Sequence, residues 1–232
     1  MQAPAGRPRR RRVEEKERRI IAAARAEFRR HGFDKARIAE IARRVGVAEG
    51  TVYLYFANKN ALLLAVAAEI YDGLTREAAA GVEEIADTRG RLAFLARLHF
   101  RRLLREWRLL VMAMTPYKMA DDYGSTEGYR LNRAYVRVFD LVIRDGVNRG
   151  EIRADLPLGV MRDMFYGGLE YAVRTHRLRP AGSDPDPMLD HFLGAFAAGI
   201  MARPAAAGAA REAEPVTRRL EEVAARLEAM LR

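Results

Sequence analysis

Apolar residues recur at helical spacing along nearly the whole chain, and this pattern limits the fold more than any other feature. In one stretch Leu62, Val66, Ile70 and Leu74 repeat every four residues, which places them on a single helix face. No run of alternating β-branched and aromatic residues between turn residues predicts a strand. The 232 residues, half of them apolar, can bury a substantial core. The sequence therefore predicts an all-α protein.

Glycine, proline and aspartate residues mark the expected helix ends. Gly32 stands where a left-handed stop is needed, and Asn58 is placed to cap the helix that begins near Lys59. The predicted helices are 14–31, 37–45, 48–56, 59–85, 89–105, 107–117, 125–149, 157–178, 187–202 and 216–232.

The positive charge is concentrated at one end of the chain. Residues 1–60 hold sixteen Lys and Arg against seven Asp and Glu, a net charge of +9 out of +10 for the whole chain. Such an asymmetry indicates that the first module meets a polyanion, either nucleic acid or an anionic membrane. A basic, solvated surface is the alternative interpretation.

Residues 38–56 have the spacing of a helix-turn-helix. Ala42 is a small residue where two helices would cross, Gly46 permits the turn, and Val52 anchors the second helix. The second helix would then present outward-facing residues to base edges in the major groove, namely Glu49, Gly50, Thr51 and Tyr53. The alternative is an ordinary helical hairpin in a core.

Residues 18–63 resemble the DNA-binding region of TetR-type repressors. The matching residues include Ala23-Ala24, Gly32-Phe33, Val45-Gly46-Val47, Gly50-Thr51-Val52-Tyr53 and Tyr55-Phe56. The resemblance implies phosphate contacts from Tyr53, Tyr55 and Lys59, and base or backbone contacts at Gly50 and Thr51.

Two positions depart from the pattern of that family. Ala48 replaces a serine that caps the recognition helix in many members, which predicts a less rigid helix start. Arg37 stands in place of a small hydroxyl residue and would add a phosphate contact. A basic arm precedes the first helix, and its arginines Arg9, Arg10, Arg11 and Arg12 either enter the minor groove or form a solubilising tail.

The same resemblance implies a ligand-binding and dimerisation domain after the DNA-binding domain. Helices 157–178 and 187–202 would pair with their symmetry mates in a homodimer, because a protein that binds a palindromic DNA site needs two recognition helices. Packing inside a monomer core is the alternative. The expected organisation is a disordered arm (1–13), a DNA-binding domain (14–60), an effector and dimerisation domain (61–202), a linker (203–215) and an amphipathic helix (216–232).

The central helices carry apolar and methionine side chains suited to a hydrophobic effector. The candidate pocket residues are Leu98, Leu103, Trp107, Met112, Tyr135, Phe139 and Phe165. Several stretches, such as RDMFYGGLEYAV, resemble FadR-type TetR regulators, which implies a long-chain acyl-CoA effector and control of fatty-acid genes. Arg101 and Arg105, which lie close to Trp107 in the sequence, would then contact the phosphates of coenzyme A at the mouth of an apolar tunnel. A drug-like or sterol-like effector, with control of efflux or other metabolism, stays open as the alternative.

Other classes of protein find little support. The chain has no cysteine, the four histidines lack short metal-ligand spacing, and no phosphate-binding glycine motif is present, so we expect neither an enzyme nor a metal or cofactor site. His99 with Glu106 and Tyr166 with Glu170 are pairs of the kind that any helical protein offers. A DNA-packaging protein would not need a neutral domain with a lipophilic interior. No apolar segment predicts a signal peptide or membrane span, and we expect a cytoplasmic protein.

Overall fold

The computed structural model describes residues 7–118 and 121–202, and within these ranges the chain is helical, as predicted. The helices are α1 (Arg7–Lys35), α2 (Ile38–Val45), α3 (Glu49–Tyr55), α4 (Lys59–Glu83), α5 (Thr88–Lys118), α6 (Glu127–Asn148), α7 (Leu158–His176) and α8 (Asp186–Ile200). A short 3-10 turn, Tyr123–Ser125, precedes α6. The described ranges hold one isolated antiparallel bridge, Ile152 with Met201, and no strand. The expected linker 203–215 and helix 216–232 lie outside the described residues.

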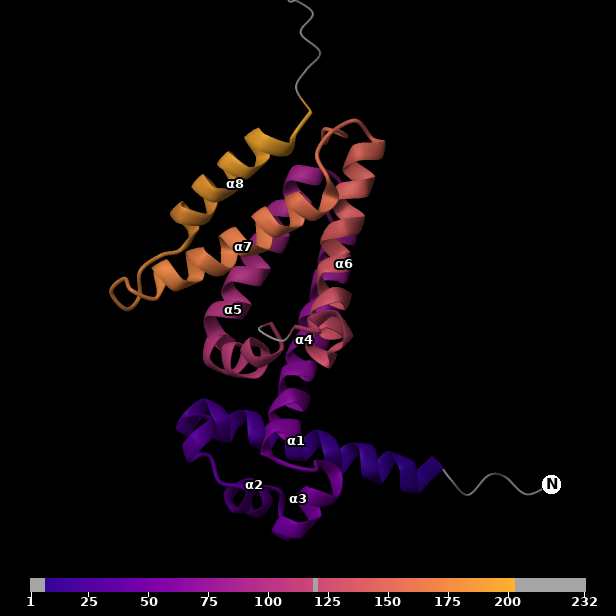
Figure 1. Cartoon of the computed structure of the whole chain (residues 1–232), viewed down its shortest axis with the longest axis vertical. Helices are drawn as coiled ribbons and strands as arrows, with labels where there is room; N and C mark the ends of the chain where they lie inside the picture. Colours follow the sequence, from indigo (N-terminus) through magenta and orange to yellow (C-terminus); the bar gives the residue numbers. More distant parts are fainter. Residues whose placement is uncertain (1–6, 119–120, 203–232) are drawn as a thin grey trace, which may run out of the picture.

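The helices form a small head and a larger body (Figure 1). The head contains α1, α2 and α3, and the body is built from α5 to α8 around the upper part of α4. Helix α4 begins in the head, where it packs on α1, and continues into the body between α5 and α6. A rotation of α4 would therefore move the head relative to the body.

The core of the head is the apolar face expected from the sequence. Ile20, Ala24 and Phe28 of α1 are buried, and they pack in one cluster with Ile41 of α2 and Val52 of α3. The expected left-handed stop is present, because Gly32 has φ 75° and interrupts the helical geometry of α1. Asn58 caps α4 as predicted, since its Oδ1 accepts a hydrogen bond from the backbone N–H of Ala61 at 2.8 Å.

The first helix begins earlier than predicted. Helix α1 starts at Arg7, so residues 7–13, expected to belong to a disordered arm, are helical. Arginine and glutamate are good helix formers, and the single proline falls in the first turn, where its missing N–H costs no intrahelical bond. Arg11 and Arg12 are consequently exposed residues of a helix, and only residues 1–6 of the expected arm lie outside the described part.

A single helix replaces the two that were predicted over 89–105 and 107–117. Helix α5 runs without interruption from Thr88 to Lys118. Glu106, the residue between the two predicted helices, lies inside α5, and its buried carboxylate is paired with Arg25 of α1. The continuous helix thus reaches from the far end of the body to the head.

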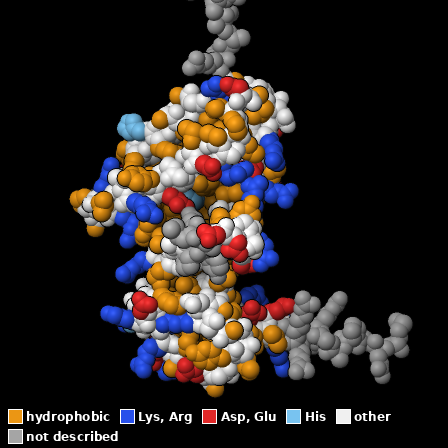
Figure 2. Space-filling model, in the orientation of Figure 1, with side chains coloured by type: hydrophobic (Ala, Val, Ile, Leu, Met, Phe, Trp, Pro, Cys, Tyr) orange, Lys and Arg blue, Asp and Glu red, His pale blue; other side chains and the backbone are white. Residues whose placement is uncertain are grey.

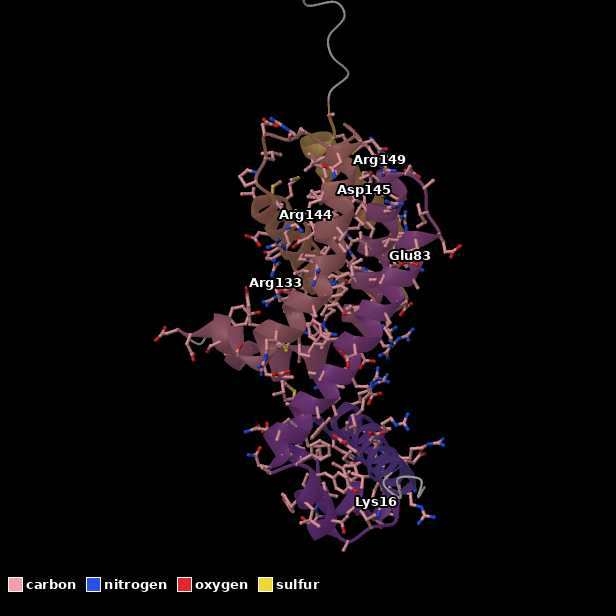
Figure 3. All side chains as sticks on the ribbon, turned by 90° about the vertical axis from the view of Figure 1, so that its right-hand side faces the viewer. Lys16, Glu83, Arg133, Arg144, Asp145 and Arg149 are labelled. Carbon is pink, nitrogen blue, oxygen red and sulfur yellow. The ribbon has the colours of Figure 1, made fainter. Side chains whose placement is uncertain are left out.

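Polar contacts stabilise the end of the body that lies away from the head. Arg91 donates a hydrogen bond to Asp145 at 2.6 Å, and Arg149 donates to the Thr88 hydroxyl at 2.7 Å. Hydrogen bonds from Thr88 also lower the pKa of Glu151. Figure 3 shows Asp145 and Arg149 near the upper end of α6, with Lys16 at the opposite end of the molecule. These charges have a structural role that is separate from DNA binding.

Candidate DNA-binding surface and effector cavity

Helices α2 and α3 form the helix-turn-helix that the spacing predicted. Ala42 is buried where the two helices meet, and Gly46 adopts the left-handed conformation with φ 74°. The backbone N–H of Val47 donates to the carbonyl oxygen of Ala42 at 3.0 Å, which closes α2 before the turn. Val52 is buried under α3. The crossing of the two helices is therefore fixed by a small residue, a left-handed glycine and an apolar anchor.

Buried charges hold α1 against this motif. The carboxylate of Glu27 is buried and lies 3.3 Å from the guanidinium of Arg44 on α2. Arg19 donates to the carbonyl oxygen of Val45 at 3.0 Å, so it satisfies the last turn of α2. The orientation of α2 and α3 is thus coupled to the position of α1.

Most of the predicted DNA contacts lie on the open side of α3. Glu49, Gly50 and Tyr53 are exposed, and Thr51 and Tyr55 are half-buried. A side-chain atom placed on Gly50 would meet no heavy atom within 4 Å, so another backbone can approach closely there. Ala48 provides no side-chain cap, as expected from its residue type.

Leu54 belongs to the same surface and was not predicted from the sequence. It is 86% exposed, which makes it the most exposed apolar residue of α3. Leu54 follows Gly50 by four residues, and this spacing could have placed it on the outward face. An apolar side chain at this position can contact the methyl group of thymine.

The start of α4 carries Lys59, another residue that was predicted to contact DNA. The ammonium of Lys59 donates to the backbone carbonyl of Asp34 at 3.1 Å and lies 4.7 Å from the centre of the Phe33 ring. These contacts hold the charge at the N-terminus of α4, where unpaired backbone N–H groups also favour an anion. Figure 2 shows further Lys and Arg side chains projecting from the lower part of the molecule. Nearby, the hydrogen bond from Arg43 lowers the pKa of Glu40, which keeps that pair ionised.

The Lys59→Gln variant should bind DNA more weakly whatever the DNA sequence, because a phosphate contact carries no sequence information. Losing one phosphate contact per subunit should reduce the salt dependence of binding by about one unit for each contact. The measurement is fluorescence anisotropy with labelled operator over a range of salt concentrations. Arg144→Gln, on the exposed side of α6 in the body, is the matched control and should leave the slope unchanged. An unaltered slope in the Lys59 variant would remove this lysine from the interface.

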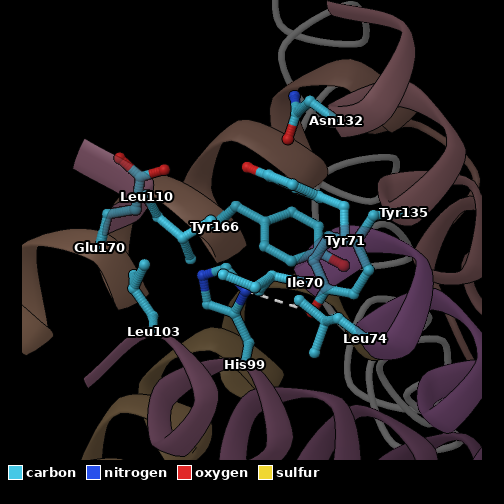
Figure 4. A pocket seen from close by; sticks show the side chains of 10 residues that line it. All are labelled: Ile70, Tyr71, Leu74, His99, Leu103, Leu110, Asn132, Tyr135, Tyr166 and Glu170. Atoms are coloured by element: carbon cyan, nitrogen blue, oxygen red, sulfur yellow. Dashed lines mark hydrogen bonds between the residues drawn. The ribbon is translucent and has the colours of Figure 1, made fainter. Parts of the chain in front are cut away.

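The body contains a cavity between α4, α5, α6 and α7. Figure 4 shows its wall, which is formed by Ile70, Tyr71, Leu74, His99, Leu103, Leu110, Asn132, Tyr135, Tyr166 and Glu170. This inner cavity has a volume of about 30 Å³. A second, outer cavity of about 190 Å³ shares Tyr71, Leu103, Leu110 and Glu170 with it and adds Trp107 and Arg174. The two cavities adjoin each other at these four shared residues, and together they are called the path.

Neutral aromatic groups dominate the inner end of the path. Burial raises the pKa values of Tyr71, Tyr135 and Tyr166, so the three hydroxyl groups stay protonated. The hydroxyl of Tyr135 lies 3.1 Å from Nδ1 of His99, and the two rings are stacked with centres 5.7 Å apart. The arrangement suits an apolar ligand that carries one polar, hydrogen-bonding group.

The structure brings only some of the predicted pocket residues together. Leu103, Trp107 and Tyr135 line the path, whereas Phe139 and Phe165 are fully buried with ring centres 4.8 Å apart and form core. The predicted set did not include Tyr71, His99, Tyr166 and Glu170, which line the inner cavity. The spacing of Tyr166 and Glu170, one helical turn apart, is the signal that could have found two of them.

The arginines predicted to contact coenzyme A lie elsewhere. Arg101 and Arg105 line a surface groove with Arg97, Arg102, Glu77, Phe94 and Leu98. At 3.6 residues per turn, these two arginines lie on the face of α5 roughly opposite Leu103 and Leu110. Leu98 and Met112 fall on that same outer half of the helix. Arg101 is also paired with Asp186 at 3.1 Å. The expectation that Arg101 and Arg105 lie with Trp107 at the mouth of the ligand cavity is therefore wrong, because closeness in sequence does not give a shared helix face.

An apolar stripe runs along the outer face of α7. Val160, Met164 and Tyr171 are exposed and follow helical spacing, and the exposed Leu178 comes just after the end of the helix. Exposed apolar residues in such a row are typical of an interface. Gly168 of α7 packs closely on Phe192, because an added side-chain carbon would come within 2.5 Å of that ring. Helices α7 and α8 thus form one closely packed pair with an apolar outer surface.

One buried ion pair joins the head to the body. Arg25 of α1 donates to Glu106 of α5 at 2.5 Å, and Glu106 is only 1% exposed. Arg25 also lies 4.0 Å from Glu69 of α4. Because Glu106 precedes Trp107 and follows Leu103 by one turn, the same segment of α5 forms the cavity wall and holds the head.

The described residues contain no helix that is both long and apolar enough to cross a membrane. Within 7–118 and 121–202, no three His, Asp or Glu side chains are arranged to hold a metal ion.

Two family models match consecutive parts of the chain. The model of bacterial regulatory proteins of the tetR family matches residues 20–66. The model of the C-terminal region of YsiA-like proteins matches residues 71–180. Together these matches cover more than half of the chain, including the helix-turn-helix and the cavity.

Individual proteins show the same relationship. The fatty acid metabolism regulator protein of Bacillus subtilis (strain 168) is 26% identical over 156 residues, which is 67% of this chain and 80% of that protein. The crystal structure of FadR from Bacillus subtilis in complex with stearoyl-CoA has a TM-score of 0.66 at 24% identity, covering 78% of this chain and 98% of that one. A putative regulator from Saccharomonospora viridis in complex with choline has a TM-score of 0.67 at 24% identity, covering 82% of this chain and all of that one. Both structures share the fold described here.

Proposed function

The chain belongs to the TetR family of bacterial transcriptional regulators, and from this premise we propose that it is a homodimeric repressor that releases a palindromic operator when a long-chain acyl-CoA binds. Such a repressor would control genes of fatty-acid metabolism. The observation that carries the proposal is the path from Trp107 to Tyr135, which is lined by apolar and aromatic side chains with a few polar groups, enclosed by four helices and joined to the head through Glu106. Similarity to the Bacillus subtilis fatty acid metabolism regulator supports the choice of ligand class.

DNA recognition is assigned to α3 and its neighbours. Thr51, Tyr53 and Leu54 meet bases or the sugar–phosphate backbone in the major groove, while Tyr55, Lys59 and Arg37 contact phosphates. The exposure of Tyr53 and Leu54 supports this division. In the dimer, α7 and α8 pair with their symmetry mates, so that two recognition helices stand about 34 Å apart.

Ligand binding would have to separate the helices of the body. Ligand pockets commonly measure about 300–1,000 Å³, whereas the inner and outer cavities measure about 30 and 190 Å³. A long acyl chain therefore favours a state in which α5 has moved away from α4 and α7. Glu106 would move with α5 and displace Arg25 and α1. The two recognition helices of the dimer would then no longer match the spacing of the two half-sites in the operator. The ligand shifts the population only because it binds this second state better.

The test is release of DNA by defined ligands. The full-length protein first selects its palindrome from random DNA, and binding is then measured by anisotropy with stearoyl-CoA, stearic acid or free coenzyme A. We expect stearoyl-CoA to weaken operator binding between about 5- and 150-fold, the usual range of allosteric coupling. Operator and stearoyl-CoA bound together without mutual weakening would contradict the proposal.

An effector with a cationic group is the second candidate. The carboxylate of Glu170 and the rings of Tyr71, Tyr166 and Trp107 surround the path, and aromatic rings with an acid are suited to a cation. Drug-like cations and choline are therefore also tested as ligands in the release experiment. Release by these compounds alone, without a response to stearoyl-CoA, would favour a regulator of efflux or other metabolism.

A further inference from the structure

Two arginines of α7 lie over the ring of Trp107, the sole tryptophan of the chain. The guanidinium carbon of Arg174 is 5.4 Å from the ring centre, and that of Arg177 is 5.6 Å away. Arg174 and Trp107 both line the outer cavity. The indole thus holds two positive charges beside the entrance of the path into the body.

These two charges differ from three arginines of α5 that line the surface groove. Arg97, Arg101 and Arg102 of the surface groove are paired with Asp190, Asp186 and Glu77. Neither Arg174 nor Arg177 forms an ion pair within the described part of the chain, and both are exposed. An uncompensated pair of guanidinium groups on a rigid aromatic surface is a suitable binding site for phosphate oxygens.

Both residues lie at the C-terminal end of α7, and this position offers a purely structural role. A positive charge there interacts favourably with the helix dipole. That role requires no aromatic support, and it affects the stability of the protein without affecting ligand binding. The two roles therefore predict different results.

We propose that Arg174 and Arg177, supported by Trp107, bind the phosphate groups of the effector while its chain enters the cavity. This inference rests on the proposed function, because it assigns the headgroup of the same ligand. Glu170 lies one turn before Arg174 and lines both cavities.

The experiment compares two double variants of the full-length protein. Arg174→Gln with Arg177→Gln removes the proposed site, and Arg137→Gln with Arg144→Gln removes two exposed, unpaired charges of α6 as a control. Calorimetry gives the affinity for stearoyl-CoA, and the fluorescence of Trp107 reports occupation of the site. Operator affinity and melting temperature, measured on the same samples, show whether either variant has a structural defect.

We expect the Arg174/Arg177 variant to bind stearoyl-CoA at least about 30-fold more weakly, since hydrogen bonds to charged groups are the stronger ones. Its affinity for uncharged octadecanol and for operator DNA should stay as in the unaltered protein. The control variant should bind stearoyl-CoA normally. Equal affinity of the Arg174/Arg177 variant and the unaltered protein for stearoyl-CoA would overturn the assignment and leave the proposed function standing.

An additional measurement distinguishes a failure of the phosphate site from a failure of the proposed function. If the unaltered protein does not bind stearoyl-CoA, the proposed function fails, and 1-oleoyl lysophosphatidate becomes the probe. Binding of this lipid that depends on Arg174 and Arg177 would support a phosphate site for a different phospholipid effector. No binding of either phosphorylated probe would overturn the phosphate site as well. A loss of affinity in Arg101→Gln with Arg105→Gln alone would move the site to the surface groove and also overturn the assignment.

Discussion

Replacing Met164 and Tyr171 with glutamate should convert the protein to a monomer and lower its operator affinity at least about 100-fold, because the second half-site contact is then no longer intramolecular. Met164 is 52% exposed and Tyr171 is 72% exposed, and both lie in the apolar stripe of α7. In a two-fold interface the same surface meets itself, so each introduced carboxylate faces its symmetry mate. Light scattering measures the mass, and anisotropy measures the affinity for the full palindrome.

Leu141→Glu is the matched control for this experiment. Leu141 is an equally exposed apolar residue, but it lies on α6, outside the stripe. The control should remain dimeric and bind the palindrome normally. A dimer that survives glutamate at both Met164 and Tyr171 would place the interface on another surface.

The sequence could predict the DNA-binding motif because its determinants are local. Gly46 can adopt a left-handed conformation, and Asn58 can cap the next helix, whatever the rest of the chain does. The residues that face outward on α3 follow from helical spacing once Val52 is known to face inward. Local geometry thus gives most of the head, including the position of Tyr53.

The interior of the body depends on contacts between distant residues, which spacing alone does not reveal. Two helices were predicted on either side of Glu106, yet one helix contains it, and its partner Arg25, which allows its burial, is 81 residues away. Arg101 and Trp107 are close in sequence but lie on different faces of that helix. Tyr71 and Tyr166 meet in the cavity only because α4 and α7 approach there. The sequence therefore predicted an apolar and partly aromatic interior, but it did not predict the polar groups that line the cavity.

The ion pair between Arg25 and Glu106 should connect effector binding to the head, and it can be tested by removing one or both charges. Arg25→Met leaves the buried carboxylate unpaired and should lower the free energy of unfolding by about 3–5 kcal/mol. Arg97→Met breaks an exposed pair with Asp190 as a control and should cost no more than about 1 kcal/mol. Chemical denaturation at one fixed protein concentration gives both values, since dimer stability depends on concentration.

The double variant Arg25→Met with Glu106→Met distinguishes stability from communication. Removing both charges of a buried pair is often close to neutral, so most of the stability should return. Helix α5 would then move without pulling α1, and the effector that releases the unaltered protein should weaken operator binding less than about 2-fold, below the usual range of allosteric coupling. Anisotropy with operator and saturating effector measures this factor. A double variant that is stable and still releases DNA as fully as the unaltered protein would exclude the ion pair as the connection and leave α4, through the position of Lys59, as the route between cavity and head.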